Sequence, residues 1–112
     1  MIRIFLLLNS RRCIVELTVQ GHAPKRDRES SIPCAAVSAL TGTVARLIDT
    51  RDGIISNGSA DKPGELQIRI KEIEKKSVEW LQGVTDFLVF GLKEVEREYP
   101  SECSVLMKTQ EE

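Results

Sequence analysis

The chain has 112 residues, which is the size of one domain built around one hydrophobic core. Hydrophobic residues make up 41% of it and charged residues 29%, values that are ordinary for a globular protein. A formal net charge of −1 gives no electrostatic reason to expect nucleic-acid affinity, which normally needs a basic surface. We therefore expect a single domain over residues 1–112 that makes no direct contact with nucleic acid.

The first elements are expected to form a hairpin. Residues 2–8 are rich in Ile and Leu and predict a strand, residues 9–12 supply turn chemistry, and residues 13–20 alternate as a second strand. The inward positions of the second strand are expected to be Cys13, Val15, Leu17 and Val19. Gly21 ends this strand and leaves His22, the one histidine of the chain, at its exit.

Residues 23–31 contain a charged run and no apolar anchor, so they predict an exposed loop. Ser30 or Ser31 can cap the next helix, and Pro33 suits its first turn. The core stripe of this helix is expected to be Val37, Leu40, Val44, Leu47 and Ile48. Cys34 lies about a quarter-turn off the centre of that stripe, on the side of Ser38, and is expected at the margin of the core.

The second half repeats this order. Residues 50–56 predict a short strand, residues 57–64 a loop, and residues 65–71 another alternating strand. Residues 74–98 predict a long amphipathic helix, in which Gly91 indicates close packing, and the tail at 103–107 can add a short edge strand. The order β-β-α-β-β-α predicts an α+β fold, an antiparallel sheet of about four strands with two helices on one face.

Three cysteines at wide spacing, Cys13, Cys34 and Cys103, form neither a disulfide framework nor a zinc pattern. Reduced thiols are typical of a cytosol. The apolar run at 4–8 is too short for a secretory signal, and no stretch approaches the ~20 apolar residues of a membrane span. We expect a cytoplasmic protein that has no membrane partner and needs no metal or organic cofactor.

Cys34 and His22 are the candidate catalytic pair. A thiol in the first turn of a helix lies near unpaired backbone N–H groups and the positive end of the helix dipole, which favour the thiolate. An imidazole nearby can take the thiol proton and return it to a leaving group. The competing interpretation is that Cys34 is a small buried hydrophobe and His22 a polar residue at a strand end.

Several blocks together resemble the ribosomal-processing cysteine protease (Prp) family over nearly the whole chain. These blocks are Gly21-His22-Ala23, Cys34-Ala35-Ala36-Val37-Ser38-Ala39-Leu40, Gly91-Leu92-Lys93-Glu94 and Tyr99-Pro100. The resemblance implies a homodimeric endopeptidase that removes the N-terminal extension of a large-subunit ribosomal protein. On this basis Cys34 is the nucleophile and His22 the general base and acid.

The chain departs from the family pattern in the loop before Cys34. Glu29, Ser31 and Pro33 stand where the family usually carries a glycine, an aspartate and a valine. Ser31 and Asp27 are the candidate substitutes for the aspartate, and Ser38 is a candidate hydrogen-bond donor to the thiol. Ser38 can equally bond to the carbonyl four residues earlier.

Two other functions remain open. A catalytically inactive homologue that binds the ribosome or another protein would keep the fold while its loop changed. A redox or thiol-transfer protein would need a second cysteine near Cys34, and Cys13 or Cys103 can supply one only through the fold.

Overall fold

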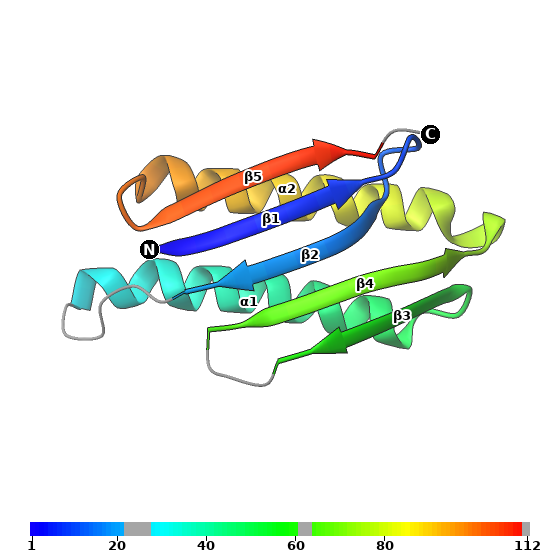
Figure 1. Ribbon diagram of the computed structural model, residues 1–112, viewed down its shortest axis with the longest axis horizontal. Helices are drawn as coiled ribbons and strands as arrows, with labels where there is room; N and C mark the ends of the chain where they lie inside the picture. The colour runs from blue at the N-terminus through cyan, green and yellow to red at the C-terminus, as the bar shows by residue number, and fades with distance from the viewer. Residues whose placement is uncertain (22–27, 61–63, 111–112) are drawn as a thin grey trace.

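The computed structural model describes residues 1–21, 28–60 and 64–110, with only the backbone described for 28–31. The described elements form two layers, a five-stranded sheet and two helices that cover one of its faces (Figure 1). The predicted α+β class and the placement of both helices on one face are confirmed. The sheet is mixed and has five strands, so the prediction of about four antiparallel strands was wrong.

The N-terminal hairpin pairs β1 (Ile2–Leu8) with β2 (Ile14–Gln20) in antiparallel register. The side chain of Asn9 organises the turn by accepting hydrogen bonds from two backbone N–H groups, each at 3.0 Å. A register shift between the last two residues of β1 places Ile14 opposite Leu8. Ile14 is therefore buried and Val15 partly exposed, which corrects the predicted alternation at this point.

The fifth strand, β5 (Cys103–Thr109), pairs in parallel with β1 and closes one edge of the sheet. With β3 (Ile54–Ser59) and β4 (Leu66–Ile73), the strand order is β3-β4-β2-β1-β5. The backbone N–H of Ile2 donates to the carbonyl of Glu102 at 2.8 Å, so the pairing begins where the chain begins. A strand in this parallel direction must be reached by a long crossover connection, and helix α2 (Val78–Glu98) supplies it between β4 and β5.

The first helix, α1 (Arg28–Thr50), is longer at both ends than expected. Residues 28–31 are helical and not loop, and Thr50 continues the helix by donating its hydroxyl to the Arg46 carbonyl at 3.0 Å. A turn at Gly53, where φ is +94°, leads into β3 (Ile54–Ser59). The predicted strand over 50–56 was therefore placed four residues too early.

Strand β4 (Leu66–Ile73) pairs with both β3 and β2 and leads through a short 3₁₀ turn (Lys75–Ser77) into α2 (Val78–Glu98). Helix α2 ends at Glu98, as the sequence predicts, and Tyr99 is its C-cap. A Cβ atom built on Gly91 would lie 3.2 Å from the Leu40 side chain. The expectation that Gly91 marks close packing is confirmed, because the glycine lets the two helices approach.

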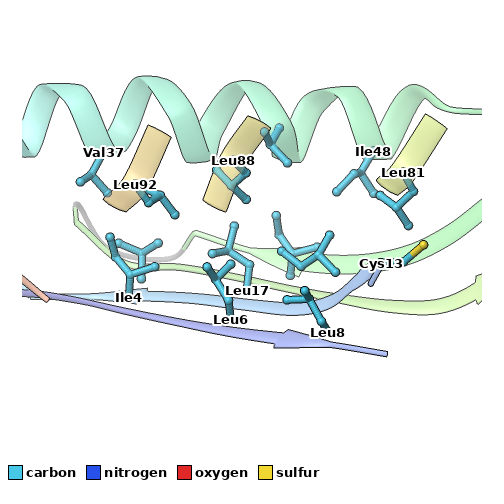
Figure 2. Close-up of a cluster of buried hydrophobic side chains, with 14 of the residues drawn as sticks. Ile4, Leu6, Leu8, Cys13, Leu17, Val37, Ile48, Leu81, Leu88 and Leu92 are labelled. Carbon is cyan, nitrogen blue, oxygen red and sulfur yellow. The ribbon is translucent and has the colours of Figure 1, made fainter. Parts of the chain in front are cut away.

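The hydrophobic core lies between the sheet and the helices (Figure 2). The side chains of this layer that point toward one another include Ile4, Leu6, Leu17, Val37, Ile48, Leu88 and Leu92. Leu47 is 44% exposed, so its assignment to the core stripe was wrong. Residues Ile32–Thr50 of α1 are long and apolar enough to cross a membrane by length and composition alone, which corrects the expectation that no such stretch exists. One face of this helix packs against the sheet, where Val37, Val44 and Ile48 are buried.

Candidate functional site

Cys34 lies near the N-terminal end of α1, half-buried and packed against the core. The predicted position at the core margin is confirmed. The predicted position in the first turn is not, because the helix begins at Arg28, six residues earlier, and encloses Pro33. The unpaired N–H groups of the helix start thus lie more than one turn from Cys34, and they do not surround its sulfur as the sequence suggested.

Of the two cysteines that the sequence left as possible neighbours of Cys34, the fold places Cys103 near enough for their charges to interact. Burial, with smaller contributions from the charges of Glu96 and Cys34, raises the pKa of the Cys103 thiol to about 11. The two cysteines lie at the same end of the molecule because β5 begins beside the start of β1, at the end of the sheet that the N-terminal half of α1 covers (Figure 1). The apolar residues around Cys103 predicted a strand in the tail, but nothing in the sequence predicted that this strand pairs in parallel with β1.

Cys13 occupies the other end of the core, below Ile48 and Leu81 (Figure 2). It is fully buried, its sulfur donates to the Val78 carbonyl at 3.6 Å, and burial raises the pKa of its thiol. These properties suit a packing role.

Gly21 fixes the point where the chain leaves β2. Its φ of +88° is a left-handed conformation, and a Cβ atom at this position would meet the carbonyl oxygen of Met1. Both conditions require glycine. Gly21 therefore releases the chain at the same end of the sheet as the start of β1.

The structure describes only some of the other predicted site residues. His22, which follows Gly21, lies outside the described residues, and so does the side chain of Ser31. Ser38 is exposed and stands one helical turn after Cys34. The distance between Cys34 and His22 therefore stays a prediction. Within residues 1–21, 28–60 and 64–110, no group of three or more His, Cys, Asp or Glu side chains is placed to hold a metal ion.

A model of the family described as cysteine protease Prp matches residues 1–104. The chain belongs to the cysteine protease Prp family. The match includes both Gly21-His22 and Cys34, and it confirms the resemblance found in the sequence. No curated protein matches the chain.

Solved structures of the same fold cover nearly the whole chain. The crystal structure of SMU.848 from Streptococcus mutans is 21% identical with a TM-score of 0.82, covering 98% of this chain and 96% of that one. The ribosomal processing protease Prp from Staphylococcus aureus, with a covalently linked product peptide, is 20% identical with a TM-score of 0.78. It covers 96% of this chain and 100% of its own. The same protease with a substrate peptide has a TM-score of 0.77 at 19% identity, with the same coverage.

Proposed function

We propose that this Prp family member is a cytoplasmic cysteine endopeptidase that removes the N-terminal extension of a large-subunit ribosomal protein. The observation that carries the proposal is the family match over residues 1–104, which contains the Gly21-His22 and Cys34 blocks in order. The half-buried position of Cys34 at the core margin supports it, since a nucleophile must be both held and accessible. The peptide complexes of the S. aureus protease support a peptide as the substrate.

The proposed reaction is covalent acyl transfer without a cofactor. The thiolate of Cys34 attacks the carbonyl carbon of the scissile bond and forms a C–S bond. The bond to the departing amine breaks as the His22 imidazolium gives that nitrogen a proton. The imidazole then removes a proton from water, which attacks the thioester and releases the acid and the thiol. Ser38, one turn from the sulfur, is proposed as a supporting donor, and Ser31 as the group in the place of the family aspartate.

The test is cleavage of a large-subunit ribosomal precursor that carries its N-terminal extension. We expect Cys34→Ala to reduce cleavage below detection, because no other described thiol combines this exposure with this position. Cys13→Ala is the matched control, since it removes a thiol at the far end of the core and should keep cleavage near the wild-type rate. Equal processing by the Cys34→Ala protein would refute the proposal.

His22→Ala tests the second member of the pair. We expect it to abolish cleavage and also to slow alkylation of Cys34 by iodoacetamide near neutral pH, because the imidazole no longer takes the thiol proton. The readout is the alkylation rate of Cys34 across pH, measured by mass spectrometry. An unchanged profile would favour the alternative, a catalytically inactive homologue that binds the ribosome or another protein.

Because Cys103 lies near Cys34, a redox function is the second candidate. Cys103 is close enough to Cys34 for the two charges to interact. Oxidation by a peroxide would take two electrons and two protons from the pair and leave one S–S bond. Peptide mapping after mild oxidation decides between the two functions. A redox function would be favoured if a Cys34–Cys103 disulfide forms at the same rate at which the oxidised protein loses cleavage activity.

A homodimer is the proposed assembly, and the outer face of α2 supports it. Phe87 and Phe90 are 63% and 71% exposed there, although large aromatic side chains are usually buried. Gly83, on the same face, has open space where its Cβ would be. Exposed acidic residues, Glu79 and Asp86, occupy the first half of this face. In the second half, Lys93 and Arg97 stand beside Glu94 and Glu98, and Arg97 pairs with Glu94 of its own chain at 2.6 Å. Two antiparallel copies would bring Glu79 of one copy near Arg97 of the other.

A further inference from the structure

A groove lies between one side of α1 and the β3–β4 hairpin, and it has a volume of about 330 Å³. Ala45, Leu66 and Ile68 give it an apolar lining, and Ser56 and Ser59 add hydroxyl groups from the edge strand. At its rim stand one cation and one anion from α1, Arg46 and Asp49. Because these two charges oppose each other, the groove offers no net attraction to a charged side chain and favours an apolar one with polar backbone nearby.

Cys34 opens on the same side of α1 as this groove. At 3.6 residues per turn, Cys34, Ala45 and Asp49 fall within about 60° of one another around the helix axis. Ser38 lies between them along this side and is small and exposed. Gly42 lies farther round the helix, and the Arg46 guanidinium lies beside it, with one nitrogen 3.6 Å from where a Gly42 Cβ would be. An extended chain that runs from the sulfur to the groove would therefore pass over Ser38, with the Arg46 side chain along its flank.

The distance along α1 between Cys34 and the groove determines how many peptide residues separate the groove from the scissile bond. Eleven residues of helix from Cys34 to Ala45 span about 16 Å at 1.5 Å per residue. An extended peptide advances about 3.3 Å per residue, so about five residues cover that length.

We propose that this groove is a specificity subsite that binds an apolar side chain of the substrate peptide about five residues from the scissile bond. The proposal rests on the proposed protease function and adds to it the place where one arm of the extended peptide lies. Its occupant is peptide in the extended conformation, since the groove is flanked by an edge strand and by the side of α1 that carries Ser38 and Ala45.

The experiment fills the groove and varies the length of the peptide. Ala60→Trp places an indole at the groove from an exposed position after β3, and Asp49→Trp does so from the exposed side of α1. Ser101→Trp is the matched control, on an exposed turn before β5 at the opposite edge of the sheet. The probes are a peptide with eight residues on each side of the scissile bond and two shortened peptides, each cut to three residues on one side.

For the long peptide, we expect each groove variant to raise KM at least tenfold while kcat stays near wild type. One of the two shortened peptides should lose this difference, since it no longer reaches the groove, and Ser101→Trp should match wild type with every peptide. The alkylation rate of Cys34 should be the same in all proteins. If wild type cleaves the long peptide and both groove variants cleave it with unchanged kcat/KM, the subsite is wrong and the protease function stands. If wild type cleaves neither this peptide nor the precursor, both are wrong.

Discussion

The three cysteine side chains differ in burial. Cys13 and Cys103 are fully buried and their thiols have raised pKa values, whereas Cys34 is half-buried. A buried thiol that ionises late is a poor nucleophile near neutral pH. The burial that makes Cys103 a poor nucleophile also makes the free energy of unfolding depend on pH through this thiol.

The raised pKa of Cys103 predicts a loss of stability in alkaline solution. Its thiol ionises near pH 9 when unfolded and near pH 11 when folded, so both states are protonated below pH 9 and the stabilisation is complete there. Between these values the unfolded chain loses its proton first. We expect the free energy of unfolding to fall by about 1–2 kcal/mol across this window. Urea denaturation from pH 8.5 to pH 11 under reducing conditions measures it.

Cys103→Ala is the control for that measurement. Its stability curve should be flatter above pH 9 than that of wild type, whatever its absolute stability. Parallel curves for the two proteins would show that other groups cause the alkaline loss.

For individual residues, the sequence predicted part of the candidate site. Helical periodicity correctly placed Cys34 beside the core, because the stripe of Val37, Val44 and Ile48 is strong enough to orient the helix. The start of the helix was misplaced because proline only prefers the first turn, and Pro33 stands farther inside α1. The proximity of Cys103 depends on strand pairing between the two ends of the chain, which local patterns do not determine.

Among the elements, the contact between α1 and α2 is governed by one glycine. Gly91 lies against Leu40, whereas Gly83 on the same helix lies against open space. The pair separates the two effects of a glycine in a helix, its low helix propensity and its small size.

Substitutions at the two positions should therefore have opposite effects. We expect Gly83→Ala to raise the free energy of unfolding by up to about 1 kcal/mol, through helix propensity alone. Gly91→Val should lower it by about 1–3 kcal/mol, because a branched side chain would force Leu40 away. Thermal and urea unfolding of both variants measure this. A stabilising Gly91→Val would mean that the helices do not pack as closely as described.

Secondary structure was predicted well where the hydrophobic pattern is regular. It was predicted poorly where a turn or the strand register determines the bounds of an element. The first strand and the end of α2 were placed correctly. The start of β3 was missed because Thr50 prolongs α1 and Gly53 makes a turn where strand was expected. The parallel direction of β5 was missed because strand sequences carry alternation but not the identity of their partner.

For the molecule as a whole, the outer face of α2 predicts the proposed dimer and its direction. In an antiparallel pair centred near Leu88, Glu79 of one copy lies opposite the Arg97 of the other. We expect Glu79→Arg and Arg97→Glu each to weaken the dimer about tenfold or more, and the double variant to restore it. Sedimentation velocity at low ionic strength measures the dissociation constants.

Leu106→Ser, at an exposed position on β5, is the control and should leave association unchanged. Monomeric wild-type protein at 100 μM or more would refute the dimer. Association without rescue in the double variant would retain the dimer and reject the antiparallel contact.

The interior position of β1 has a consequence for synthesis. This strand precedes the other four in the chain, yet one of its two hydrogen-bonding edges is paired only with residues 103–109. During translation that edge therefore stays open until β5 has emerged from the ribosome. A nascent chain should gain the stability of the complete sheet only once β5 has paired with β1.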